Sequence, residues 1–239
     1  AAGNRVVEEY TLLNALPRDV ADAHISGALN LNNLGCWVLR ASGVMHDLRF
    51  FFQHGLAFDG RYSTQISMKP PKTFKSALSI TTNILRLASA EVAGEQGIDL
   101  FNIFLAPFVK DLSKDDVKEE LSQFLTSVNL TVPTGVSLGL EIVLPTFLAD
   151  AKVHGGGLYS DYLDESLLVA SSVIECLRER EDSKPIFNPS IIVKVRSEAL
   201  KDKDAESLLH EAHGLAVQGL PYFANLNTER QKYASYTAT

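Results

Sequence analysis

Residues 113–144 read SKDDVKEELSQFLTSVNLTVPTGVSLGLEIVL, and they carry the signals of a helix followed by a strand. Ser113 and Asp116 form a start of the capping-box type, after which apolar residues recur at helical spacing: Val117, Leu121, Phe124, Leu125 and Val128. Residues 137–144 are rich in β-formers and end before Pro145, so they are predicted to form a strand. A helix that leads into a buried strand is typical of an α/β fold.

The same alternation extends in both directions from this segment. A long helix is predicted from Lys72 to Gln96, because apolar residues between Phe74 and Val92 recur at steps of four and three. A second apolar stripe, from Ala77 to Leu87, predicts that this helix is buried on two sides. Nearer the C-terminus the pattern predicts helices over residues 163–177 and 204–217, and strands over residues 191–195 and 222–226. This order implies an α/β architecture with some parallel sheet.

The composition is that of an ordinary globular protein. With 239 residues, of which 46% are hydrophobic and 21% charged, the chain can bury a sizeable core, and residues 1–239 are predicted to form a single domain. The formal net charge of −7 lacks the basic excess that binding to a phosphate backbone requires, so nucleic acid is not an expected partner.

Cysteine content and hydropathy bear on the compartment. Cys36 and Cys176 are too few for a disulfide framework and show no metal-ligand spacing, so we expect a cytoplasmic protein with no metal site. The longest apolar runs, such as residues 138–148, fall well short of the roughly 20 residues that a membrane span needs. Neither a membrane span nor a signal peptide is therefore expected.

Two short motifs suggest an alternative function, that of a serine hydrolase. Gly135-Val136-Ser137-Leu138-Gly139 fits the nucleophile-elbow pattern, with Ser137 as the nucleophile, and His154-Gly155-Gly156-Gly157 is similar to an oxyanion loop. An elbow requires a strand, a sharp turn and then a helix, whereas the residues after Ser137 are predicted to continue a strand. The motifs are equally compatible with two turns that contain glycine.

Histidines provide further candidates. His210 and His213 are three residues apart on a predicted helix, one residue short of the zincin spacing, and no third metal ligand is evident. A solvated helix face is the simpler interpretation. His46 followed by Asp47 is a candidate polarised imidazole in a pocket, against the alternative of a structural histidine.

Four blocks of the sequence, in order, resemble the anaerobic (class III) ribonucleotide reductases of the glycyl-radical enzyme family. The blocks are residues 23–34, with Ala23-His24 and Gly27; His46-Asp47-Leu48 with Gly55-Leu56; residues 72–109, with Glu91, Gln96 and Leu105-Ala106-Pro107-Phe108; and Gly219-Leu220-Pro221-Tyr222-Phe223-Ala224-Asn225. The resemblance covers most of the chain and corresponds to the N-terminal half of the family's barrel.

The resemblance implies a fold, partners and site residues. The expected fold is α/β, half of a ten-stranded α/β barrel of the glycyl-radical-enzyme type with long packing helices. Nucleoside triphosphates are the implied ligands, and the helices predicted over residues 72–96 and 115–128 are expected to pack at a homodimer interface. The residues carried over as binding candidates are His46, Asp47, Glu91, Gln96 and Asn225.

The departures from the family pattern concern its radical chemistry. The family has a reactive cysteine a few residues before His-Asp-Leu, where this chain has Ser42-Gly43-Val44-Met45, and a radical-carrying cysteine after the block that ends at Asn225. The family's glycyl radical and its zinc site also have no counterpart here, so no cofactor is expected within these residues. The chain is accordingly interpreted as a fragment or a diverged relative that keeps a nucleotide-binding scaffold and, as given, does not reduce ribonucleotides.

Overall fold

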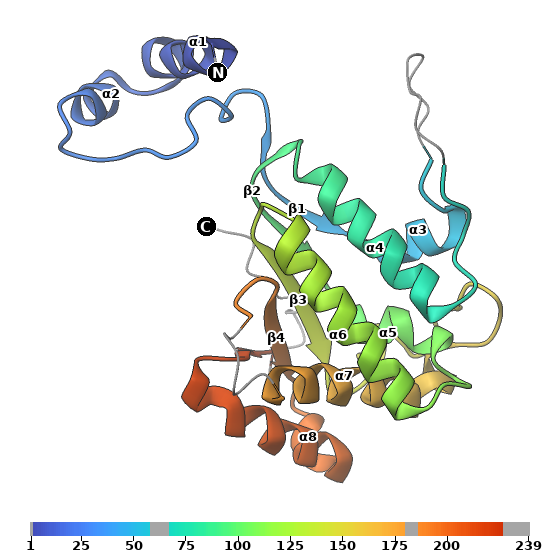
Figure 1. The fold of residues 1–239 in the computed structure, drawn as a ribbon. Helices are drawn as coiled ribbons and strands as arrows, with labels where there is room; N and C mark the ends of the chain where they lie inside the picture. Colours follow the sequence, from blue (N-terminus) through green and yellow to red (C-terminus); the bar gives the residue numbers. More distant parts are fainter. Residues whose placement is uncertain (1, 58–66, 180–185, 227–239) are drawn as a thin grey trace.

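Five parallel strands form one sheet in the order β1-β2-β3-β4-β5 in the computed structural model, which describes residues 2–57, 67–179 and 186–226 (Figure 1). The strands are β1 (Ala41–His46), β2 (Val92–Ile98), β3 (Val136–Glu141), β4 (Ser190–Val195) and β5 (Tyr222–Asn225). The helices are α1 (Ala2–Tyr10), α2 (Arg18–Ile25), α3 (Leu48–His54), α4 (Phe74–Ala88), α5 (Phe101–Leu105), α6 (Lys114–Thr131), α7 (Leu163–Arg178) and α8 (Lys203–Gly214). Short 3-10 turns include η2 (Ala106–Phe108) and η4 (Tyr159–Tyr162).

The strand order distinguishes this sheet from a doubly wound one. Each strand pairs in parallel with the next strand along the chain, so the order never reverses. A doubly wound sheet would contain a switch point at which the order reverses. The predicted α/β class with a parallel sheet is therefore confirmed, and five strands in sequential order are what half of a barrel requires. The closed ten-stranded barrel stays a prediction.

The helices cover one face of the sheet. In Figure 1, α4 and α6 run side by side across the strands, and α7 lies next to α6. Apolar side chains from alternate strand positions fill the space between the two layers: Val136, Leu138 and Leu140 from β3 and Ile191 and Val193 from β4. Burial of this face provides the main stabilisation of the fold.

Helix α6 shows why the local prediction was correct. The Ser113 hydroxyl accepts a hydrogen bond from the Asp116 backbone N–H at 3.2 Å, which satisfies a donor at the helix N-terminus. The predicted apolar positions, from Val117 to Val128, are all buried against the sheet and the neighbouring helices. The Ser113 cap therefore determines where the helix starts, and the row of apolar residues determines which side faces the core.

The prediction of one helix over residues 72–96 was wrong. Helix α4 ends at Ala88, and after a turn the chain forms strand β2 from Val92 to Ile98. Val92 falls at helical spacing from Ala88, but Gly94 and Gly97 disfavour a helix over the following residues. Consequently Glu91 lies in an exposed turn, and Gln96 lies in strand β2 rather than in the predicted helix.

Helix α4 is buried on two sides, as its two apolar stripes predicted. Phe74, Leu78 and Leu85 on one stripe and Ala77 and Ile84 on the other are all buried within this chain. Helices α3 and α6 contact α4, and Gln96 of β2 bonds to its Leu85 carbonyl oxygen. The two stripes therefore give no argument for a second subunit, and the homodimer stays a prediction.

Asn102 joins three elements at the carboxyl end of the sheet. Its side-chain amide group donates to the Glu141 carbonyl oxygen at 2.8 Å and to the Ser166 hydroxyl at 2.9 Å, while its oxygen accepts from the Glu141 N–H at 2.9 Å. Asn102 is fully buried. These bonds tie α5 to β3 and α7, so the carboxyl end of β3 is held in a fixed position.

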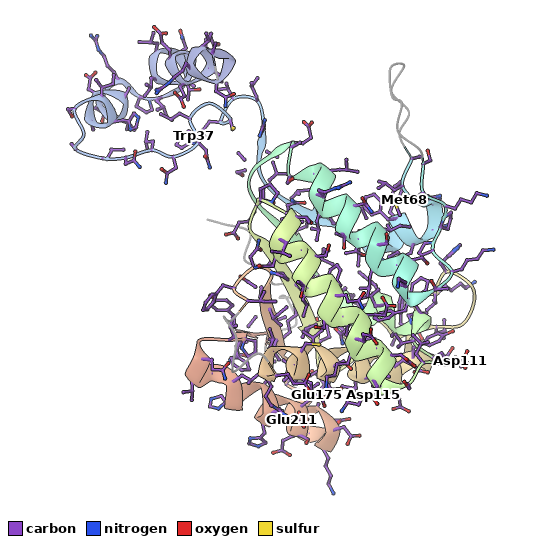
Figure 2. All side chains as sticks on the ribbon, viewed as in Figure 1. Trp37, Met68, Asp111, Asp115, Glu175 and Glu211 are labelled. Carbon is purple, nitrogen blue, oxygen red and sulfur yellow. The ribbon has the colours of Figure 1, made fainter. Side chains whose placement is uncertain are left out.

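Ion pairs link the helices at the surface. Lys114 and Lys118 of α6 pair with Glu175 and Glu179 at the end of α7, and Arg178 Nη2 lies 3.2 Å from Glu211 Oε2 on α8. Figure 2 shows Glu175 and Glu211 on these two adjacent helices. Exposed pairs of this kind contribute little stability each, about 0 to 1 kcal/mol. These ion pairs help to orient α6, α7 and α8 relative to one another, and they add little to the stability of the fold.

The N-terminal helices α1 and α2 lie apart from the sheet in Figure 1, and Trp37 lies in the segment that follows them (Figure 2). The Asn33 side chain bonds to the Ala93 carbonyl oxygen at 3.3 Å, next to β2. The prediction that residues 1–239 form a single domain stays a prediction. None of the described helices has the length and apolar character that crossing a bilayer requires.

Candidate functional site: the polar face of the sheet

The face of the sheet opposite the helices carries small and charged side chains together with Met45 and Ile192, and we call it the polar face. A Cβ atom built on Gly97 would meet the sulfur of Met45 and the hydroxyl of Ser137, and one on Gly139 would meet Asp99 and Lys194. These contacts place the side chains from β1, β2, β3 and β4 on the same side. Strand alternation explains the arrangement, because the intervening residues face the helices.

Four charged residues form a buried cluster at the carboxyl ends of β2, β3 and β4. Lys194 donates to Asp99 Oδ1, and its Nζ lies 3.5 Å from Glu141 Oε1. Arg196 binds the Glu141 carboxylate through two hydrogen bonds, Nε to Oε2 at 2.9 Å and Nη2 to Oε1 at 2.7 Å. Glu141 and Lys194 are completely buried, and Asp99 and Arg196 are less than 10% exposed. Buried charges of this kind are stable only when they are paired.

The cluster leaves one acceptor without a partner. Asp99 Oδ1 accepts from Lys194 and from the Leu100 N–H, whereas Asp99 Oδ2 is buried and accepts no hydrogen bond from the described residues. The hydroxyl of Ser137 on the same face is also buried without such a partner. Unsatisfied buried polar groups are rare, and they are characteristic of sites that bind a ligand or water.

Burial disfavours the ionised forms of the side chains in this cluster, and ion pairing favours them. Burial raises the pKa of Glu141, although its hydrogen bonds with Arg196 act in the other direction. Burial and then the nearby Arg196 guanidinium lower the pKa of Lys194 to about 7, whereas the hydrogen bond to the Asp99 carboxylate favours the charged ammonium form. The formal charges sum to zero, so the polar face suits a neutral polar ligand group better than a highly charged one.

The structure brings two of the predicted binding residues together. His46, at the end of β1, has its Nε2 atom 2.8 Å from Gln96 Oε1 on β2. The Gln96 amide nitrogen donates to the Leu85 carbonyl oxygen and to the Thr134 hydroxyl, so its oxygen must accept, and His46 Nε2 must carry the proton. Gln96 therefore orients the imidazole of His46 and links β1, α4 and the turn before β3.

The other three candidates lie elsewhere. Asp47 is the N-cap of α3 and forms a two-point ion pair with Arg49, with an Nη2 to Oδ2 distance of 2.6 Å. Glu91 is exposed in the turn before β2, and Asn225 is exposed at the end of β5. Their roles as binding residues stay predictions.

The geometry of a serine hydrolase is not present in the described residues. Ser137 is 2% exposed in the interior of β3, not on a turn that leads into a helix. His154 lies in an exposed loop after β3. Nor do the described residues contain a cluster of three or more potential metal ligands, and His210 and His213 are exposed on α8.

Cys36 and Cys176 form no disulfide, and neither belongs to a strand of the sheet. Cys36 belongs to the N-terminal segment, which contacts β2 only near its start. Cys176 is buried on α7, as predicted, and its thiol lies 3.5 Å from the Lys118 carbonyl oxygen in the helical layer. Neither thiol therefore belongs to the strand positions that make up the polar face.

Comparison with known proteins identifies the family. The family model described as anaerobic ribonucleoside-triphosphate reductase matches residues 1–239. The chain belongs to this family. A search of curated proteins found no significant match.

Solved structures of the anaerobic ribonucleotide reductase from Thermotoga maritima have a similar fold. The structure with citrate in the active site matches with a TM-score of 0.71 and 15% identity, covering 95% of this chain and 43% of that one. The complex with dATP and CTP matches with a TM-score of 0.66 and 18% identity, covering 81% of this chain and 36% of that one. The reductase-family chain described here thus spans about two-fifths of the length of these relatives.

Sequence reasoning about this reductase relative missed the charged cluster. Asp99, Glu141 and Lys194 each interrupt an apolar segment, and none of them is among the predicted site residues. The sequence offered one indication of the cluster, namely a single charged residue within or next to an apolar segment predicted to form a strand. A charge that a strand must bury requires a partner on a neighbouring strand.

A first prediction concerns the space over Gly139. In Gly139→Ala the new Cβ lies 2.5 Å from Asp99 Oδ1, which the Leu100 N–H holds in place, so the ion pair must shift. We expect a loss of about 1 to 3 kcal/mol in the free energy of unfolding, measured by urea denaturation. Gly97→Ala is the matched control, because its Cβ mainly meets the mobile end of Met45, and we expect less than about 1 kcal/mol. Equal effects of the two changes would contradict this account.

A second prediction concerns pH. Burial lowers the pKa of His46 below its usual 6.5, although the bond to Gln96 opposes this. The unfolded chain then binds a proton more readily than the folded chain, so stability decreases as the pH falls below 6.5 towards the lowered pKa. In urea unfolding between about pH 8 and pH 5, wild type should lose stability relative to His46→Gln on the acid side. A stability difference between wild type and His46→Gln that does not change with pH would refute the lowered pKa of His46.

Proposed function

We propose that this chain is the nucleotide-binding N-terminal half of a barrel of the anaerobic ribonucleotide reductase type, with the polar face as the wall that meets the nucleotide. The family match and the sequential parallel sheet support the architecture. The observation that carries the proposal is the unpartnered oxygen of Asp99, which lies beside a charged cluster with no net charge. An acceptor in such a place fits a sugar hydroxyl, which donates a hydrogen bond and carries no charge.

The proposal assigns positions to the polar groups. Asp99 Oδ2 accepts from a ribose hydroxyl, and the Ser137 hydroxyl offers a second polar contact on the same face. Lys194 and Arg196 hold the two carboxylates in place rather than bind phosphate, because both are engaged by Asp99 and Glu141. The phosphates of a nucleotide would therefore lie away from this cluster.

The second part of the proposal is that the chain does not reduce ribonucleotides with its own groups. The family's chemistry needs a glycyl radical, a thiol that relays it to the ribose, and a reductant. Cys36 and Cys176, the two cysteines of the sequence, lie away from the polar face. The zinc site of the family does not fit the described residues, which offer no suitable cluster of ligands. Two cysteines that form no disulfide also agree with a cytoplasmic location, which forms part of the proposal.

An anaerobic turnover assay tests this part. The chain would be incubated with an activating radical enzyme, formate or a thiol reductant, and all four ribonucleoside triphosphates. We expect no deoxyribonucleotide, because hydrogen abstraction requires a thiyl radical held against the sugar. Turnover that survives Cys36→Ala and Cys176→Ala together would refute the argument, and turnover lost on either change would identify a thiol that the structure misplaces.

The third part concerns an effector nucleotide and a homodimer. A groove of about 340 Å³ lies between α4 and α6, with Lys75 and Arg86 on one side and Glu120 and Ser127 on the other. The side chain of Lys75 is 74% exposed, so its ammonium group remains accessible although it pairs with Glu120 at 3.4 Å. One structure of the Thermotoga maritima enzyme is described with dATP bound in the specificity site. We propose that dATP binds in this groove and that two chains meet over it.

Calorimetry with dATP, combined with light scattering, tests the groove. We expect binding to wild type and a dimer mass at micromolar concentration, because phosphate groups pair strongly with exposed cations. Arg86→Gln and Lys75→Gln should each weaken dATP binding by about tenfold, whereas Lys203→Gln on the exposed start of α8 should not. A monomer at all concentrations, or equal affinity in all variants, would contradict this part.

A further inference from the structure

A second cavity shares no lining residue with the groove between α4 and α6 or with the charged cluster of the polar face. It has a volume of about 540 Å³ and is bounded by α3, by α5 with η2, and by the loop over residues 152–159. This loop contains the His154-Gly155-Gly156-Gly157 motif, which neither the hydrolase hypothesis nor the proposed function explains. Cavities of this size commonly bind small molecules.

Aromatic rings form the floor of the cavity. Phe52 and Phe108 meet edge to face at a centroid distance of 5.1 Å, and Phe104 and Tyr159 lie 5.7 Å apart. Phe50, at the edge, is 60% exposed, although its ring also contacts the Phe51 ring at a centroid distance of 5.4 Å and the His54 ring at 4.9 Å. An exposed phenyl ring beside a rigid aromatic floor is suited to a planar aromatic group, because rings stack without a change in the protein.

Polar side chains also line the cavity. The Arg49 guanidinium is fixed by the Asp47 carboxylate and lies 5.2 Å from the centre of the Phe104 ring. Lys152 and His154 project from the exposed loop, and no ion pair joins either of them to another described residue. Burial raises the pKa of Tyr159 to about 12, so its hydroxyl stays protonated and can donate a hydrogen bond.

The glycines keep the rim open. Gly155, Gly156 and Gly157 have φ angles of 104°, 113° and 82°, a region that other residues rarely adopt. No atom lies within 4 Å of a Cβ built on Gly155 or Gly156, so the loop has free space on this side. Three consecutive residues between His154 and Tyr159 thus have positive φ angles. Residues with a Cβ atom would be strained in this loop conformation, so the glycines maintain the shape of the rim.

The charge of the rim decides the class of ligand. Asp47 neutralises Arg49, and Lys152 therefore supplies about one net positive charge, with the His154 imidazole beside it. One positive charge is much smaller than the total charge of a triphosphate and is closer to that of a single phosphate group, about −1.5 to −2 at neutral pH. The aromatic floor matches a purine or pyrimidine base.

We propose that this cavity is a binding site for a nucleoside monophosphate, with the base against Phe50 and the phosphate against Lys152 and His154. The site is separate from the groove between α4 and α6 and from the polar face, so it does not depend on the proposed function. Tyr159 and Arg49 shape the boundary between the aromatic floor and the charged rim.

Calorimetry with AMP, adenosine and inorganic phosphate tests the proposal. Measurements in the Lys75→Gln, Arg86→Gln background remove the contribution of the groove, so failure of this site and failure of the groove can be told apart. We expect AMP to bind at least tenfold more tightly than adenosine, which lacks the charge, and than phosphate, which lacks the base. ATP should gain no affinity over AMP.

Variants locate the site. Lys152→Ala and Phe50→Ala should each weaken AMP binding about tenfold, and because both side chains are exposed their replacement leaves the core intact. Lys203→Ala on α8 is the control and should have no effect. Unchanged AMP affinity in both cavity variants, equal binding of AMP and adenosine, much tighter binding of ATP, or no AMP binding would each overturn the proposal.

Discussion

The structure depends on the pairing of four buried charges across three strands. Glu141 and Lys194 are register partners on β3 and β4, and Asp99 reaches Lys194 over the space that Gly139 leaves free. A slip of one residue in either strand would turn these charges towards the apolar core, where they would have no partner. Removal of one member of a buried pair typically costs about 3 to 5 kcal/mol, so the cluster selects one register strongly. Every other group on the sheet is positioned by that register.

Elements with strong local signals were predicted from the sequence. Helix α6 has a capping residue and a single apolar stripe, and β3 and β4 are short apolar segments bounded by turns, so each could be placed before the structure was known. Strand β2 was missed, because Val92 continues the spacing of α4 while Gly94 and Gly97 leave too few side chains for a strand pattern. Here the pairing with β1 and β3, and not local preference, makes the segment extended.

The candidate site could be predicted only in part. His46 and Gln96 were both identified, but their contact joins residues 50 positions apart, and no local pattern reports such a contact. The four charges of the cluster come from three strands, and their common face follows from strand pairing rather than from spacing along the chain. Family resemblance pointed to the correct fold and did not reveal these residues, since it was based on contiguous blocks of sequence.

The strand order has a consequence for how the chain behaves in isolation. Within the described residues β1 pairs only with β2, and β5 only with β4, so both borders of the sheet offer backbone N–H and C=O groups to another strand. The same groups that would receive a second set of strands can also join two copies of this chain edge to edge. Pairing of these edge strands with further strands of a barrel therefore competes with pairing between two copies of this chain. A higher protein concentration favours pairing between copies.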